Sequence, residues 1–118
     1  IQVFYEGQDL PTLPGVISIT LYRFLQEALT NIIKHAEAHK VFVNLEYDGT
    51  IIQLSVQDDG KGFDLKSLRS PASPPRGIGL LGIEERLTLL NGYLTIQSQV
   101  GKGTELTAYI TFKGEPHD

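Results

Sequence analysis

The sequence predicts a single α+β domain, in which helices are combined with antiparallel pairs of strands. Residues 20–36 and 80–90 have the apolar spacing of amphipathic helices. Two glycine turns, Asp48-Gly49 and Gly101-Lys102-Gly103, each separate two runs of strand-forming residues and so predict two hairpins. A chain of 118 residues, 41% of them hydrophobic, has enough apolar content for one core.

The N-terminal part is expected to form a strand followed by a long helix. Residues 1–6 alternate weakly, which predicts a short strand at a sheet edge. Residues 7–15 contain two prolines and two glycines and predict an extended connection. Ser18 or Thr20 is the expected N-cap of helix 20–36. The residues of this helix expected to face the core are Leu21, Leu25, Ala28, Leu29, Ile32, Ile33 and Ala36.

The rest of the chain alternates strands, a loop and a second helix. The four hairpin strands are expected at residues 41–47, 51–58, 93–98 and 104–112. Residues 64–76 contain three prolines and three serines without a sustained period, which predicts a mobile loop. Helix 80–90 is stopped by Asn91-Gly92, and the tail 114–118 is expected to fray. Its expected core contacts are Ile83, Leu87 and Leu90.

Composition excludes several classes of function. The net charge is −4 and the 10 Lys and Arg residues are scattered, which argues against a nucleic-acid partner. The chain has no Cys, so a zinc-thiolate site, a disulfide or a thiol nucleophile is excluded. It has no apolar run of about 18 residues, so we expect no direct membrane contact. Because it begins at Ile1 and lacks Met, we expect domain 1–118 to be a piece of a longer protein.

The first candidate site is a row of polar groups on helix 20–36. Glu27, Asn31 and Lys34 lie at i, i+4 and i+7, opposite the apolar stripe, with Arg23 one turn earlier and His35 at the edge. An acid, a carboxamide and an ammonium stacked in this way are able to hold a metal and a polyanion. The alternative is an ordinary solvated helix face.

The second candidate site is the DDGKGF sequence at the end of strand 51–58. Strand parity places Asp58 on the buried face and Asp59 on the other. A buried carboxylate needs hydrogen-bond donors, and the exocyclic amino group of a purine is a suitable one. Gly60 and Gly62 allow a sharp turn and the close approach of a flat ring. The alternatives are a plain Asp-Gly turn and, for Phe63, a place in the core.

Two further glycine clusters follow. Gly77, Gly79 and Gly82 stand before or within the first turn of helix 80–90, where free amide groups are able to bind phosphate oxygens. Their spacing matches neither a Walker A loop nor a Rossmann fingerprint, and such glycines also serve as hinges. The preceding loop suggests a lid that closes over phosphates. In GKGT, Thr104 would offer a hydroxyl to a purine or a bound water, although an ordinary hairpin turn is the simpler explanation of this motif when it is considered alone.

Taken together, these motifs resemble those of a known family. They occur in the order ExxxN followed by KHA, then DxGxG, GxGLxG and GxGT. This set is similar to the ATP-binding fold shared by gyrase, Hsp90, histidine kinases and MutL. The stretches LYRFLQEALTNIIKHAEA and RGIGLLGIEERL resemble, more narrowly, sensor histidine kinases that work with LuxR/NarL-type response regulators. The resemblance covers residues 1–112, and the order and spacing of the four motifs make it specific.

The resemblance implies a fold and a set of roles. The fold is an α/β two-layer sandwich of the Bergerat type, with a mixed, largely antiparallel sheet of about five strands, about three helices on one face and a mobile ATP lid at about residues 64–80. Asn31 would coordinate Mg²⁺, and Glu27 would orient a water or act as a base. Asp58 would accept the adenine amino group. The residues implied to line the rest of the ATP site are Lys34, His35, Gly60, Gly62, Gly77, Gly79, Leu80 and Thr104.

The resemblance also implies partners. The domain would donate the γ-phosphoryl group of Mg-ATP to a histidine on a separate dimerisation domain, and a LuxR/NarL-type response regulator would act downstream. We expect the domain to be cytoplasmic and monomeric, and a membrane anchor elsewhere in the complete protein is compatible with this. The acceptor histidine is absent, since His35 belongs to the nucleotide motif and His39 and His117 are expected on the surface. Two alternatives are an ATPase of the gyrase or Hsp90 kind, with Glu27 as base, and a degenerate scaffold.

Overall fold

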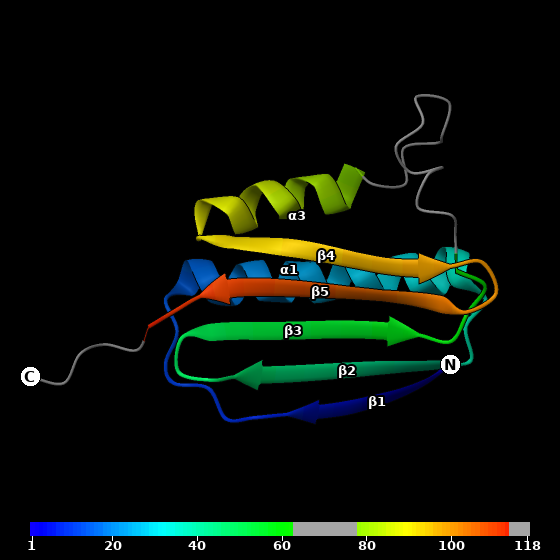
Figure 1. The fold of residues 1–118 in the computed structure, drawn as a ribbon, viewed down its shortest axis with the longest axis horizontal. Helices are drawn as coiled ribbons and strands as arrows, with labels where there is room; N and C mark the ends of the chain where they lie inside the picture. Colours follow the sequence, from blue (N-terminus) through cyan, green and yellow to red (C-terminus); the bar gives the residue numbers. More distant parts are fainter. Residues whose placement is uncertain (63–77, 114–118) are drawn as a thin grey trace, which may run out of the picture.

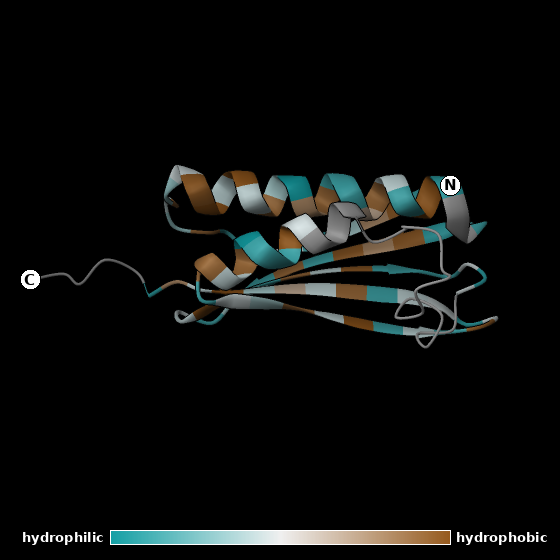
Figure 2. Cartoon of the chain, turned by 90° about the horizontal axis from the view of Figure 1, so that it is seen from above, coloured by the Kyte–Doolittle hydropathy of each residue, from teal (hydrophilic) through white to brown (hydrophobic). Residues whose placement is uncertain are grey.

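The computed structural model describes residues 1–62 and 78–113. Within these residues the chain forms one five-stranded sheet, and both helices pack on the same face of it (Figures 1 and 2). No helix of the described residues lies on the other face of the sheet (Figure 2). The elements are β1 (Gln2–Gly7), α1 (Gly15–Asn31), the π-helical turn η1 (Ile32–Ala36), β2 (Lys40–Tyr47), β3 (Ile51–Asp58), α3 (Ile78–Leu89), β4 (Gly92–Gln99) and β5 (Gly103–Thr111).

The sheet has the strand order β1-β2-β3-β5-β4. The pairs β2–β3 and β4–β5 are antiparallel, as the two glycine turns predicted, and β3 also pairs antiparallel with β5. β1 lies at one edge, where a strand was expected, and runs parallel to β2. The sheet is therefore mixed and largely antiparallel, which confirms the predicted two-layer α+β fold, with two helices rather than about three in the described part.

The first hairpin turn is held by one side chain. The Asp48 carboxylate accepts hydrogen bonds from the backbone N–H groups of Thr50 and Ile51, both at 2.8 Å. These bonds lower the pKa of Asp48, because they favour its charged form. Gly49 follows with φ of +95°, a conformation that costs glycine nothing. The Asp-Gly pair therefore fixes the register of β2 against β3 locally.

Helix α1 starts five residues earlier than predicted, at Gly15 instead of Thr20, so neither Ser18 nor Thr20 is its N-cap. Pro14 occupies that position, and its carbonyl accepts from the N–H groups of Ile17 and Ser18 at 3.0 and 3.2 Å. Thr20 is buried inside the helix, where its hydroxyl donates to a carbonyl one turn back at 2.7 Å. A hydroxyl residue inside a helix can satisfy itself in this way, so it resembles a cap in sequence without being one.

The apolar stripe of α1 differs from the predicted one at three positions. Phe24 is fully buried and Ile17 is buried, although neither was predicted to face the core. Ile33 was predicted to be buried, and this is wrong, because its side chain is 69% exposed. The stripe is centred on Phe24, and from Ile32 onward the chain follows a wider π-helical turn, so the spacing of an α-helix no longer applies.

Helix α3 starts at Ile78, two residues before the predicted start. Its predicted core residues Ile83 and Leu87 are buried against α1 and β4, and the helix is followed by Asn91 with a φ of +58°. Glu84, Glu85 and Arg86 of α3 are exposed. In the described residues no helix is both long and apolar enough to cross a membrane.

Two leucines of α3 provide a matched test of the core. Leu87 is fully buried and Leu89 is 84% exposed. We expect Leu87→Ala to lower the free energy of unfolding by about 2–5 kcal/mol, because it removes buried methyl groups and leaves a cavity. Leu89→Ala should change it by less than about 0.5 kcal/mol. Denaturant unfolding measures both, and equal effects would contradict the packing of α3 described here.

Candidate functional site

Asp58 ends β3 on the face that the helices cover. It continues the buried row formed by Ile52, Leu54 and Val56, and its side chain is only 4% exposed. The parity argument made from the sequence is therefore confirmed. The Asp58 Oδ1 accepts a hydrogen bond from the Gly60 N–H at 2.8 Å. A carboxylate has about four lone-pair sites, so this residue retains acceptor capacity beyond that bond.

The electrostatics of Asp58 reflect a balance of opposing effects. Burial raises its pKa above the usual 3.8, because removal from water disfavours the charged form. Hydrogen bonds from the backbone N–H groups of Gly60 and Thr104 act in the opposite direction, while the neighbouring Asp59 adds a smaller upward contribution. The upward effect of burial is the larger. A donor from a ligand would therefore meet a carboxylate that is poorly solvated in the free protein.

Asp59 lies on the other face and has a different role. Its carboxylate accepts from the backbone N–H groups of His39 and Lys40 at 2.8 and 2.9 Å, and these bonds lower its pKa. The Asp59 N–H in turn donates to the Lys40 carbonyl at 3.2 Å. Asp59 therefore ties the end of β3 to the start of β2, which holds in place the strand end that carries Asp58.

Two glycines allow the loop after β3 to pack against the β4–β5 turn. Gly62 has a φ of +62° and Gly103 a φ of +84°. A Cβ on Gly62 would collide with the Gln99 carbonyl, and one on Gly103 with the Asp58 carbonyl. The Gly101 N–H donates to the Lys61 carbonyl at 2.6 Å across the same contact. Gly62 therefore turns the backbone, as predicted. The group that approaches it closely in this structure is the backbone of the β4–β5 turn.

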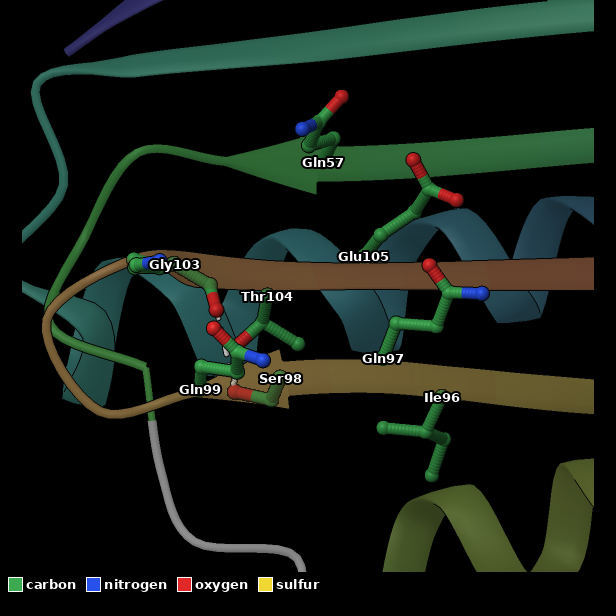
Figure 3. A pocket seen from close by; sticks show the side chains of 9 residues that line it. Gln57, Ile96, Gln97, Ser98, Gln99, Gly103, Thr104 and Glu105 are labelled. Carbon is green, nitrogen blue, oxygen red and sulfur yellow. Dashed lines mark hydrogen bonds between the residues drawn. The ribbon is translucent and has the colours of Figure 1, made fainter.

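Thr104 faces Asp58 across the sheet. The two residues are directly opposite in the β3–β5 register, and Thr104 is 8% exposed. Ser98 is opposite Thr104 on β4, and the two hydroxyl oxygens are 2.8 Å apart (Figure 3). The register thus places a carboxylate and two hydroxyls side by side on three neighbouring strands, on the helix-covered face.

A surface hollow of about 440 Å³ lies at this end of the second hairpin (Figure 3). It includes Ser98 and Thr104 but neither Asp58 nor Asn31, so it overlaps the candidate site only in part. The other residues that line it are Gln57, Ile96, Gln97, Gln99, Lys102, Gly103 and Glu105.

The polar row of the first helix lies at the same end of the molecule. Figure 1 shows the C-terminal end of α1 beside the end of the sheet where β3 finishes and β5 begins. Asn31 is the last residue of α1 and Glu27 stands one turn earlier; both are half-buried. Lys34 and His35 belong to η1, where Lys34 is exposed and the His35 side chain lies outside the described part. A π-helical turn is rare and often marks a functional position.

Several predicted residues fall outside the described structure. Gly77, Phe63 and His117 are among them, as is most of the predicted lid at 64–80. Gly79 and Leu80 form part of the first turn of α3, as expected for the glycine cluster, and that turn contains no acidic residue. Their proposed contacts with phosphate remain predictions.

Comparison with known proteins gives concordant results. Residues 17–114 match the family model of histidine kinase-, DNA gyrase B- and HSP90-like ATPases. The chain belongs to this family. It is 41% identical over 103 residues to the signal transduction histidine-protein kinase/phosphatase DegS of Bacillus subtilis, covering 87% of this chain and 26% of that protein. A DegS of Brevibacillus brevis is 35% identical over 102 residues, covering 86% of this chain and 25% of that protein.

A solved structure shares the fold of this ATPase-family domain. The histidine kinase domain of the blue-light-activated histidine kinase of Erythrobacter litoralis superimposes with a TM-score of 0.73 at 20% identity, covering 92% of this chain and 50% of that one. The predicted resemblance to the ATP-binding domain of histidine kinases is therefore confirmed. The chain spans about a quarter of the length of the DegS relatives.

Sequence reasoning missed two residues of this site. For Asp59 we predicted only the face of the strand on which its side chain lies. For Ser98 we made no prediction. The predicted turn at 101–103 would pair residue 98 with residue 106, whereas the observed loop at 100–102 pairs Ser98 with Thr104. What the pattern did not reveal is that both partners are hydroxyl residues on the helix-covered face.

The two adjacent aspartates should respond oppositely to loss of charge. The pKa of Asp58 is higher in the folded protein than in the unfolded chain, so the folded protein binds this proton more tightly. Ionisation of Asp58 therefore destabilises the fold, increasingly so as the pH rises from 3.8 through the raised pKa. Asp59, with a lowered pKa, stabilises the fold above 3.8 and loses this effect as the pH falls through its lowered pKa. At neutral pH we expect Asp58→Asn to keep or raise the melting temperature and Asp59→Asn to lower it.

Thermal unfolding followed by circular dichroism between acid and neutral pH measures both variants. A melting temperature lowered equally by the two substitutions would contradict the assignment of burial to Asp58 and of backbone anchoring to Asp59.

Proposed function

We propose that this domain binds ATP with Mg²⁺ and donates the γ-phosphoryl group to a histidine on a separate dimerisation domain of a two-component system. The observation that carries the proposal is Asp58, a carboxylate buried to 4% exposure at the end of β3. Two features support adenine as its partner. The residue has unused acceptor capacity, and family membership indicates an ATP-binding domain.

The donor set of α1 suits a magnesium ion that arrives with the nucleotide. Among the described residues, no three His, Cys, Asp or Glu side chains are close enough to form a metal site. Mg²⁺ commonly uses one or two protein oxygens and takes the rest from phosphates and water. In the proposal, the Asn31 carboxamide supplies such an oxygen, and Glu27 orients a metal-bound water or acts as a base. The ion would neutralise charge on the transferred phosphoryl group.

The phosphates would lie between η1 and the start of α3. A helix N-terminus with free N–H groups and no acidic side chain in its first turn favours an anion. We therefore assign Gly77, Gly79 and Leu80 to phosphate binding, with Lys34 and His35 approaching from η1. The contribution of these residues to phosphoryl transfer is positioning and charge neutralisation.

The proposed protein partners follow from the names of the related proteins. The DegS relatives are histidine-protein kinases, and this chain matches about a quarter of their length. We propose that the remainder of the complete protein supplies the dimerisation helices and the acceptor histidine. A response regulator of the LuxR/NarL type would then receive the phosphoryl group. In this proposal the domain acts in the cytoplasm.

Nucleotide titration tests the site directly. We expect Asp58→Ala to weaken binding of both ATP and ADP by roughly 100-fold, because it removes a hydrogen bond to a charged group. Asn31→Ala should mainly abolish the dependence on Mg²⁺. Calorimetric titration with and without Mg²⁺ measures both effects.

A matched control accompanies this titration. Asn44→Ala removes a half-buried asparagine of β2 whose side chain bonds Glu46. It should leave affinity unchanged. Unaltered nucleotide binding in Asp58→Ala and Asn31→Ala would rule out the proposed site.

Phosphate release separates a kinase from a gyrase-type ATPase. We expect the 118-residue chain to release little phosphate from bound ATP, because the acceptor histidine belongs to another domain. A gyrase-type enzyme would turn over steadily and lose this activity in Glu27→Gln. Glu46→Gln, an exposed glutamate of β2, is the matched control. Steady hydrolysis that depends on Glu27 would contradict the kinase proposal.

A further inference from the structure

The face of the sheet opposite the described helices carries two stacked pairs of aromatic rings (Figure 2 shows this face without a helix over it). Phe4 of β1 and Phe42 of β2 lie toward one edge, with ring centroids 5.2 Å apart. Tyr93 of β4 and Tyr109 of β5 lie toward the other edge, with centroids 4.5 Å apart. Phe42 remains 44% exposed and Tyr93 55% exposed, so stacking leaves much of these rings open to a partner.

Two small side chains lie between the aromatic pairs. Ser55 of β3 is the diagonal neighbour of Phe42 on this face, and Thr107 of β5 stands two residues before Tyr109. Ser55 and Thr107 are directly opposite each other, with their hydroxyl oxygens 3.3 Å apart. A band of side chains therefore crosses the sheet diagonally from Phe4 to Tyr93. Strand spacing and residue rise give the band a length of about 23 Å, which equals about 15 residues of helix.

Glutamates stand on both sides of this diagonal band. Glu6 of β1 and Glu46 of β2 lie on one side, and Glu105 of β5 lies on the other. Among the side chains of the five described strands that point to this face, Lys40 is the one cation. It lies at the start of β2, next to the Asp59 carboxylate that accepts from its N–H. The face therefore combines exposed apolar rings with net negative charge.

We propose that this face of the sheet is a docking surface for a basic amphipathic helix of a partner protein. Apolar side chains of that helix would cover the diagonal band, and Lys or Arg side chains on its two flanks would pair with the glutamates. Arginine also stacks favourably on exposed aromatic rings. A second copy of this chain fits less well, because it would bring three glutamates against three others. Asp58 and Thr104 lie on the opposite face, so the proposal is independent of nucleotide binding.

A sheet face that only contacts water would behave differently. Antiparallel sheets commonly expose one polar face, and cross-strand aromatic pairs stabilise the sheet itself. A basic helix would then be attracted only by the net charge of −4. Its affinity would follow the total charge of the protein and would not depend on which glutamates or which rings are replaced.

The charge test uses a labelled 15-residue peptide with leucines at helical spacing and lysines on both flanks, titrated with the 118-residue chain in fluorescence anisotropy. We expect Glu46→Lys combined with Glu105→Lys to weaken binding by roughly tenfold, because two attractive charges become repulsive. The matched control is Glu84→Lys combined with Glu85→Lys, which changes the net charge equally from the exposed side of α3. At 0.15 M salt, where distant charges are screened, this control should weaken binding by less than about twofold.

The apolar test replaces exposed rings on the same peptide titration. We expect Phe42→Ser combined with Tyr93→Ser to weaken binding by roughly tenfold, because apolar contact area is lost. Ile19→Ser combined with Tyr22→Ser is the matched control, since these side chains of α1 are similarly exposed, at 45% and 64%. It should leave affinity unchanged. If the sheet variant fails to fold by circular dichroism, the charge test still decides.

Two further peptides separate the proposed partner from other occupants. A peptide with glutamate in place of lysine, and one of the same composition with its spacing scrambled, should each bind at least about tenfold more weakly. Equal affinity for either peptide, equal weakening by the sheet and α3 charge reversals, or no binding of the basic peptide would overturn the proposal. Concentration-dependent self-association in sedimentation that Phe42→Ser abolishes would also overturn it, because a second copy would then occupy this face.

Discussion

The arrangement at one end of the sheet depends on the burial of a single carboxylate. Asp58 occupies a position that its strand otherwise fills with aliphatic side chains, and the helices exclude water from it. Such a group is tolerated only where donors reach it, and in the free protein backbone N–H groups provide them. The donors are available because Gly62 and Gly103 let the loop after β3 and the β4–β5 turn approach without side chains between them. The burial of the Asp58 carboxylate therefore depends on these two glycines.

The pairing register of the strands decides which side chains lie next to each other. Asp58 and Asp59 are neighbours in sequence, yet one faces the helices with a raised pKa and the other fastens β2 with a lowered one. A shift of β3 by one residue would exchange the faces of these two aspartates. The Asp48-Gly49 turn and the Asp59 anchor act against such a shift from the two ends of the β2–β3 hairpin.

The sequence predicted the features that depend on local chemistry. The two hairpins, the facing of Asp58 and the buried side of α3 follow from turn residues and periodicity, which act over a few positions. The start of α1 was predicted wrongly because Pro14 provides an entry that competes with Ser18 and Thr20, and Ile33 because a π-helical turn alters the spacing. Ser98 was missed because its contact with Thr104 depends on pairing with a neighbouring strand, which a linear pattern does not contain.

The proposed nucleotide site would separate base recognition from phosphate chemistry. Asp58, Thr104 and Ser98 lie on three strands joined by continuous pairing, so their relative positions are set by the sheet. The residues assigned to metal and phosphate instead come from the end of α1, from η1 and from the start of α3, elements attached to the sheet by side-chain packing. A hydrogen-bonded sheet resists small displacements more than a helix terminus does. In the proposed function, selection of the base would therefore stay constant while the ends of the helices adjust to the phosphoryl acceptor.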